Sequence, residues 1–172
     1  QLRHIQLTFF QNIRIQVSCC LIHGQVATSW AKAVKCEAIF AINDDVANDA
    51  LRRDLLLQIA PEHLKAYVIP VEKAIKVYHN PKYAGKNILW LVTNPTDIVR
   101  LIEGGVKIDK VNVGGMTFRE GDKMLSQAVA VNPTDVAAFK QLLDKGVELS
   151  LQQVASSPKS MLTHKELDAI QF

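Results

Sequence analysis

The sequence lacks the features that would hold a chain together without a packed core or anchor it in a membrane. Its three cysteines, Cys19, Cys20 and Cys36, provide neither a disulfide framework nor a paired metal-ligand spacing. The longest apolar runs, such as 88–92, are far shorter than the roughly 20 residues of a membrane-spanning helix. Residues 1–11 lack the pattern of a secretory signal. We therefore expect a cytoplasmic protein with reduced thiols.

An excess of charge of one sign is also missing. The chain has 20 basic and 17 acidic residues, and its net charge of +3 is too small and too evenly spread for a nucleic-acid-binding surface. Its 172 residues, 48% of them apolar, suffice for one hydrophobic core. We predict a single domain over 13–172, preceded by a poorly patterned N-terminal segment or linker over 1–12.

Short β-branched runs alternate with stretches of helical periodicity. Most of these runs are almost continuously apolar, which is typical of parallel strands that helices cover on both faces. The pattern predicts an α/β fold, an open, doubly wound and mainly parallel sheet with helices on both faces. The expected strands are 13–17, 37–42, 65–69, 87–92, 110–113, 127–131 and 147–154.

Several helices can be predicted from their periodicity and their ends. Leu51, Leu55 and Ile59 recur every four residues and predict the buried face of one helix over 46–60. An Asn-Pro-Thr-Asp tetrad, which combines a capping residue with a first-turn proline and acid, opens two more helices. A Thr-Glu capping box opens a last one, which we expect to end near Gln171. These helices begin at Asn94, Asn132 and Thr163.

Loops that follow parallel strands gather at one edge of a doubly wound sheet, and ligands bind there. The loops expected at this edge are 18–23, 43–46, 93–96 and 114–121. We interpret the acids Asp44, Asp45 and Asp49 as favoured by the start of a helix rather than as metal ligands. Residues 114–116 indicate a tight turn rather than a dinucleotide-binding loop. We predict neither a metal site nor a cofactor.

His23 is the residue best placed for chemistry. It follows the first expected strand and precedes Gly24 and a segment of helical spacing. Backbone amides at the start of that helix could hold phosphate oxygens while the imidazole attacks phosphorus. A neutral imidazole is available near pH 7. The position alone favours the simpler interpretation of His23 as a polar residue at a strand-to-helix turn, and the local context does not overturn it.

Motifs along the chain carry a family resemblance. They occupy 21–26 (Leu-Ile-His-Gly-Gln-Val), 43–49, 71–74, 93–97, 111–116 and 145–149. The first resembles the active-site motif of the mannose/fructose/sorbose family of IIB components of the bacterial phosphotransferase system (PTS). The others match this family in the same order, and together they cover roughly residues 13–157.

The resemblance implies a phosphoryl carrier in sugar uptake. His23 would accept the group from a phosphohistidine of the IIA component and pass it to a sugar held by the membrane components IIC and IID. Gly24 and Gln25 would belong to the phosphoryl-binding loop. The protein would associate with the inner face of the membrane through IIC and IID. The resemblance does not determine the oligomeric state, but an exposed apolar helix face could support a homodimer.

One departure from the family pattern affects the proposed site. The family usually has Arg-Ile-Asp-Asp-Arg before the histidine motif, whereas this chain has Gln16-Val17-Ser18-Cys19-Cys20. Cys20 therefore replaces an arginine that is expected to support the phosphoryl group, and a thiol cannot replace a guanidinium fork. Either turnover is impaired, or Arg14 or Arg119 supplies the charge. An error in the sequence before Leu21 would give the same loss of pattern.

Two other functions are compatible with the sequence. A docking or regulatory module would keep the binding surface of the family but lack transfer because of Cys20. A nucleotide-binding α/β domain would share only the fold, and mononucleotides would raise its melting temperature.

Overall fold

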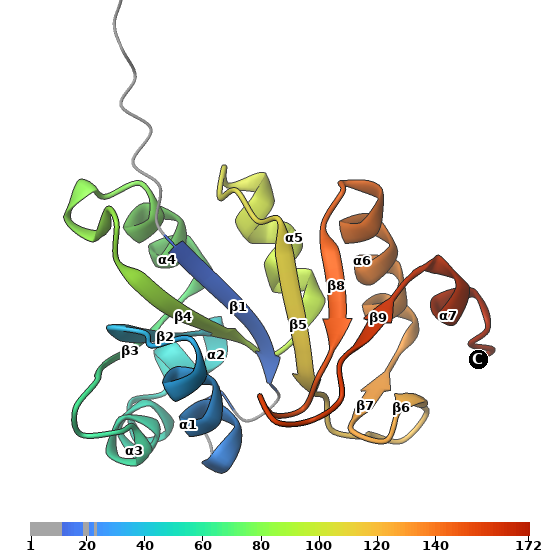
Figure 1. The fold of residues 1–172 in the computed structure, drawn as a ribbon, viewed down its shortest axis with the longest axis horizontal. Coiled ribbons are helices and arrows are strands. Elements are labelled where there is room, and N and C mark those ends of the chain that lie inside the picture. Colours follow the sequence, from blue (N-terminus) through green and yellow to red (C-terminus); the bar gives the residue numbers. More distant parts are fainter. Residues whose placement is uncertain (1–11, 19–20, 23) are drawn as a thin grey trace, which may run out of the picture.

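The computed structural model describes residues 12–18, 21–22 and 24–172 (Figure 1). The main sheet has seven strands in the order β3-β2-β4-β1-β5-β8-β9. The first six strands of this order pair in parallel, and β9 pairs antiparallel with β8. These strands are β1 (Asn12–Ser18), β2 (Ala38–Ile42), β3 (Lys65–Ile69), β4 (Asn87–Val92), β5 (Lys110–Gly115), β8 (Glu148–Leu151) and β9 (Ser160–Leu162).

Helices cover both faces of this sheet, as the sequence predicts (Figure 1). Helices α1 to α3 pack on one face and α4 to α6 on the other, with α7 beside α6. No helix in the described part of the chain is long and apolar enough to cross a membrane. The helices are α1 (Gly24–Ala33), α2 (Asp44–Asn48), α3 (Ala50–Ile59), α4 (Val71–Tyr78), α5 (Pro95–Glu103), α6 (Pro133–Asp144) and α7 (His164–Asp168), with a 3₁₀ turn η1 (Pro81–Tyr83).

The central strand β4 explains why the expected strands are continuously apolar. Ile88, Trp90 and Val92 pack into the core beneath α4 to α6, while Leu89 and Leu91 pack beneath α1 to α3. All five side chains are fully buried. Since successive side chains of a strand point to opposite faces, a strand covered on both faces needs apolar residues at every position.

The direction of the winding reverses at the centre of the sheet. From β1 the chain crosses to β2 on one side, and from β4 it crosses to β5 on the other side of β1. The loops after β1 and β4 therefore diverge to opposite faces. Such a divergence leaves a crevice at the carboxyl edge of the sheet, where doubly wound proteins bind their ligands.

The C-terminal strands differ from the prediction. The strand expected over 127–131 is not in the main sheet, because β7 (Val129–Val131) pairs antiparallel with the unpredicted β6 (Lys123–Ser126). The strand expected over 147–154 ends at Leu151, because the Gln152 side chain donates to two backbone carbonyls of the next turn. Strand β9 was not predicted.

The helix expected over 46–60 is two helices. Asp49 ends α2, and its carboxylate accepts the N–H of Arg52 at 3.2 Å, which caps α3. The predicted buried face is wrong, because Leu51, Leu55 and Ile59 are 70%, 49% and 52% exposed. The new start at Asp49 changes the rotational phase of the helix, so that a different side of α3 packs on the sheet.

The other helix starts are confirmed. Asn94 and Asn132 cap α5 and α6 through their side chains, and Thr163 forms a capping box with Glu166. Helix α7 ends at Asp168, earlier than predicted. The turn predicted over 114–116 is wrong, because β5 continues through Gly115, where it pairs with Ser18 across a shift in register.

Candidate functional site

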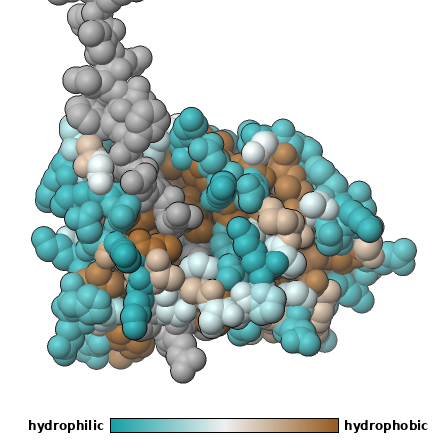
Figure 2. Space-filling model, viewed as in Figure 1, coloured by the Kyte–Doolittle hydropathy of each residue, from teal (hydrophilic) through white to brown (hydrophobic). Residues whose placement is uncertain are grey.

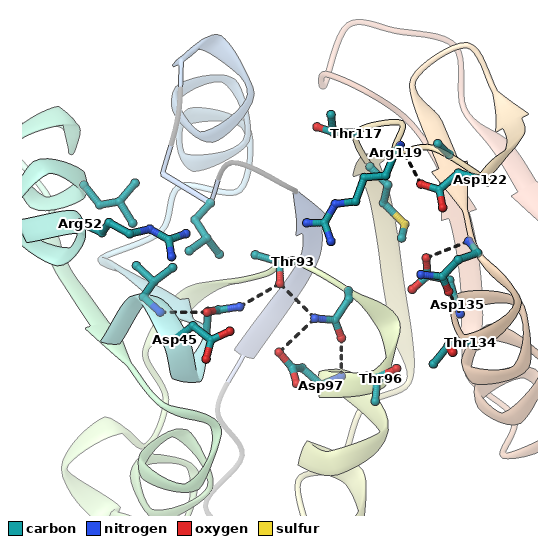
Figure 3. Close-up of a pocket in the computed structure, with 18 of the residues that line it drawn as sticks. Asp45, Arg52, Thr93, Thr96, Asp97, Thr117, Arg119, Asp122, Thr134 and Asp135 are labelled. Carbon is teal, nitrogen blue, oxygen red and sulfur yellow. Dashed lines mark hydrogen bonds between the residues drawn. The ribbon is translucent and has the colours of Figure 1, made fainter. Parts of the chain in front are cut away.

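A cleft of about 780 Å³ opens at the carboxyl edge of the sheet. Leu21, Asn43, Thr93 and Met116, which follow β1, β2, β4 and β5, contribute to its lining. Helix α3 forms one wall, and the segment from β5 to the start of α6 forms the other (Figure 3). The predicted edge loops therefore meet at one site.

Three helices begin at this cleft, and an asparagine caps each of them. The side-chain oxygens of Asn43, Asn94 and Asn132 accept backbone N–H groups of α2, α5 and α6 at 3.0, 2.9 and 2.7 Å. All three asparagines line the cleft. Because the N-terminus of a helix carries partial positive charge, α5 and α6 in particular favour an anion at this edge.

Thr93 lies between two of these caps. Its Oγ1 atom accepts N–H groups from the side-chain amides of Asn43 and Asn94, each at 3.0 Å. These bonds join the loop after β2 to the loop after β4, which are neighbouring strands of the sheet. The polar floor of the cleft is thus held together by side chains from two loops (Figure 3).

Two arginines face each other across the cleft. Arg52 extends from α3, and Arg119 extends from the opposite wall, with Thr93 between and below them in Figure 3. Among the described residues, neither guanidinium forms an ion pair. Arg119 interacts electrostatically with the Asp135 carboxylate on its own wall. A guanidinium offers the fork geometry that suits phosphate oxygens, so both side chains could contact a bound anion.

Two carboxylates on the wall opposite α3 are engaged by backbone donors. Asp122 accepts the N–H of Arg119 at 2.9 Å, and Asp135 accepts the N–H of Asn132 at 3.1 Å. Burial raises the pKa of Asp135 above its usual range, although the hydrogen bond from Asn132 opposes this effect. These bonds hold the loop that carries Arg119 and close the capping box of α6.

A charge network lies beside the floor of the cleft. The Arg100 guanidinium contacts Asp44 at 2.9 Å and Asp97 at 3.0 Å. Asp44 also accepts the N–H of Val71 at 2.9 Å, and this bond is the main reason that its pKa is lowered. Burial instead raises the pKa of Asp97. The network connects the first turns of α2, α4 and α5.

The first residue of the histidine motif has an unusual backbone conformation. Leu21 has a φ of 52°, in the left-handed region that non-glycine residues seldom adopt. Its N–H donates to the carbonyl of Ser18 at 3.0 Å, and its side chain is buried against the α1 to α3 face. Burial holds Leu21 in this conformation, and such strained residues cluster at functional sites.

Several predicted site residues lie wholly or partly outside the described structure. His23 and Cys20 are outside the described residues, although their neighbours Leu21 and Gly24 are described. Gly24 is the first residue of α1, as expected for a residue at the start of a helix, and Gln25 follows it in that helix.

The two arginines named from the sequence occupy different parts of the fold. Arg119 lines the cleft, as expected. Arg14 pairs with Leu89 within β1, so its backbone is roughly 13 Å along the strand from Ser18. Arg52, which also lines the cleft, was not predicted as a site residue, because the buried face of α3 was predicted wrongly. Its position one turn after the capping Asp49 was the available signal.

Comparisons with known proteins agree with this fold. The chain is 51% identical over 139 residues to the mannose-specific EIIAB component of Escherichia coli, a match that covers 81% of the chain and 43% of that protein. It thus spans less than half the length of that relative. It is 46% identical over 145 residues to the sorbose-specific EIIB component of Klebsiella pneumoniae, covering 84% of the chain and 88% of the relative.

A solved structure of a IIB domain is also similar to this chain. The IIBSor domain of the Klebsiella pneumoniae sorbose permease superimposes with a TM-score of 0.87 at 42% identity, over 92% of this chain and 98% of that one. A family model described as the PTS system sorbose subfamily IIB component matches residues 13–168. Because this match covers most of the chain, the protein belongs to the sorbose subfamily of PTS IIB components.

Proposed function

We propose that this chain carries a phosphoryl group on His23 between a IIA component and a sugar bound by membrane components IIC and IID. The observation that supports this most is the cleft, which Leu21 of the histidine motif lines together with Arg52 and Arg119. A neutral imidazole, two guanidinium groups that form no ion pair within the described residues, and helix N-termini suit phosphoryl transfer, which requires mainly positioning and charge stabilisation.

The proposed reaction has two displacements at phosphorus. A nitrogen of His23 forms a P–N bond as the P–N bond to the IIA histidine breaks, which returns that histidine to its neutral form. A sugar hydroxyl oxygen then forms a P–O bond as the P–N bond to His23 breaks, and the hydroxyl proton, in the net reaction, returns the His23 imidazole to its neutral form. Carriers of this kind act at the inner face of the membrane, where IIC and IID hold the sugar.

The first test is intact-mass spectrometry after incubation with phosphoenolpyruvate, the general PTS proteins and a IIA component. We expect one acid-labile phosphoryl adduct on the wild type and none on His23→Ala. The matched control is His63→Ala, since His63 is an exposed histidine outside the cleft. An adduct that survives in His23→Ala would contradict the proposed carrier.

Cys20 distinguishes the carrier from a docking or regulatory module. If Arg119 and Arg52 supply the charge, Cys20→Arg should change the rate of phosphoryl uptake little. If the wild type takes up no group from an active IIA component but Cys20→Arg does, the wild-type chain is a docking module. The same mass measurement on the two proteins decides between these functions.

A further inference from the structure

The Thr93 hydroxyl has an orientation that its neighbours determine. Two asparagine amides donate to its Oγ1 atom, each at 3.0 Å. The assignment of amide nitrogen and oxygen is fixed independently, because the oxygens of Asn43 and Asn94 accept the capping N–H groups of α2 and α5. Each asparagine must therefore present its NH₂ group to Thr93.

The lone pairs of the Thr93 hydroxyl determine which further hydrogen bonds it can form. A threonine hydroxyl has two acceptor lone pairs and one O–H donor. The two amides occupy both lone pairs, so the hydroxyl can enter a further hydrogen bond only as a donor. Within residues 12–18, 21–22 and 24–172, no acceptor receives its proton. Thr93 lines the cleft between Arg52 and Arg119 (Figure 3).

We propose that Thr93 is a phosphoryl-binding residue, whose O–H donates to an oxygen of the phosphoryl group in the cleft. Asn43 and Asn94 are positioning residues that keep the hydroxyl a donor. This inference rests on the proposed function, since the ligand is the phosphoryl group that His23 would carry. Thr93 directly follows β4, whose Val92 pairs with Val17 near the end of β1.

The arrangement selects for a ligand that only accepts hydrogen bonds. A phosphoryl group has three such oxygens, and Thr93 together with two guanidinium groups presents only donors to them. A ligand that offers N–H or O–H groups at this point would face a hydroxyl with no free lone pair. Because the asparagines are held by helix caps, the hydroxyl needs no reorientation when the group arrives.

The test compares Thr93→Val with Thr93→Ser in single-turnover phosphoryl uptake from a phosphorylated IIA component. Valine has nearly the same shape but no hydroxyl, whereas serine keeps it. We expect the uptake rate constant to fall at least about tenfold in Thr93→Val, as for loss of a hydrogen bond to a charged group, and to be largely retained in Thr93→Ser. Equal rates in Thr93→Val and the wild type would overturn the role of Thr93.

The outcomes separate this inference from the proposed function. If the wild type acquires no adduct on His23, the proposed function fails and the role of Thr93 falls with it. If the wild type acquires the adduct and Thr93→Val acquires it equally fast, only the role of Thr93 fails. A loss that serine does not restore would also overturn it, because the loss would then come from packing.

A second variant tests the positioning role. Asn43→Asp keeps the cap of α2, because aspartate caps helices as well as asparagine does. However, its carboxylate would accept the Thr93 proton and turn the hydroxyl away from the cleft. We expect Asn43→Asp to slow phosphoryl uptake when Thr93 is present, but to cause no further slowing when it is combined with Thr93→Val. Additive losses would overturn the positioning role.

Discussion

At the scale of single residues, the cleft contains more donors than the sequence motifs indicate. The sequence singles out His23, its neighbours and Arg119 as site residues, whereas the fold adds Arg52 and brings Thr93, which begins the motif over 93–97, into the cleft. Arg52 is remote from the histidine motif in sequence, and only the position of α3 beside the carboxyl edge brings it to the cleft. Under the proposed function, two guanidinium groups on opposite walls would share the role of the arginine that the family resemblance leads us to expect at Cys20.

This view predicts that Arg52→Gln and Arg119→Gln each slow phosphoryl uptake, by about tenfold, because each removes a charge-assisted contact. The matched control is Arg53→Gln. Arg53 is adjacent in sequence, but its guanidinium donates to the Ala47 carbonyl at 3.3 Å and does not line the cleft. Single-turnover mass spectrometry measures the rates. If phosphoryl uptake is as slow in Arg53→Gln as in Arg52→Gln, the loss comes from a change in α3 as a whole and not from a lost contact in the cleft.

At the scale of secondary-structure elements, side-chain caps determine where helices begin and which side they bury. The break at Asp49 leaves Leu51, Leu55 and Ile59 exposed on α3. Figure 2 shows apolar residues at the surface over this corner of the molecule, amid hydrophilic ones. Asp44 connects α2 to two other helices, since its carboxylate accepts the N–H of Val71 in α4 and forms an ion pair with Arg100 of α5.

The lowered pKa of Asp44 predicts that this residue contributes to stability in a pH-dependent way. Because its pKa is lowered by Val71 and Arg100, its contribution is present above pH 3.8 and is lost as the pH falls through its lowered pKa. We expect Asp44→Asn to lower the melting temperature near pH 7, and the difference from the wild type to shrink below pH 3.8. Thermal unfolding across this range measures it.

The partner Arg100 provides the control for this prediction. In an Arg100→Gln background, the pH-dependent part of the Asp44→Asn effect should become smaller, because one of the two donors is gone. Asp97 acts with the opposite sign, since its raised pKa makes stability fall as the pH rises above 3.8. A difference between Asp44→Asn and the wild type that does not vary with pH would contradict the assignment.

At the scale of the whole molecule, two apolar layers hold the sheet between its helices. The larger layer lies beneath α4 to α6 and includes Phe139, which is fully buried. The smaller layer lies beneath α1 to α3 and holds Leu21 and Ile22 of the histidine motif. The site thus stands on a buried apolar layer, while its α3 wall carries exposed apolar residues such as Leu55 and Ile59.

The two layers predict that replacing Phe139 and replacing Phe118 by alanine change the free energy of unfolding by very different amounts. Phe139→Ala should lower the free energy of unfolding by about 3–5 kcal/mol, since it removes a buried ring and leaves a cavity. Phe118→Ala should change it by about 0.5 kcal/mol or less, because Phe118 is 57% exposed. Urea denaturation of the two variants measures both values. Similar losses of unfolding free energy in the two variants would contradict the exposed position of Phe118.

Much of this protein was predictable from local patterns in its sequence. Continuous apolar runs predict parallel strands with both faces covered, and the Asn-Pro-Thr-Asp tetrads predict the starts of α5 and α6, because capping depends on residues three positions apart. The motifs that follow the strands also predict a ligand edge and the family, and the family match confirms that relationship.

Other features depend on contacts between distant segments, and only the tertiary structure decided them. The exposed side of α3 follows from how α2 and α3 share the space over the sheet, which periodicity does not reveal. Strand β7 pairs with β6 because of their place beside β5. The donor role of Thr93 arises because asparagines 50 residues and one residue away point their amides at the same oxygen.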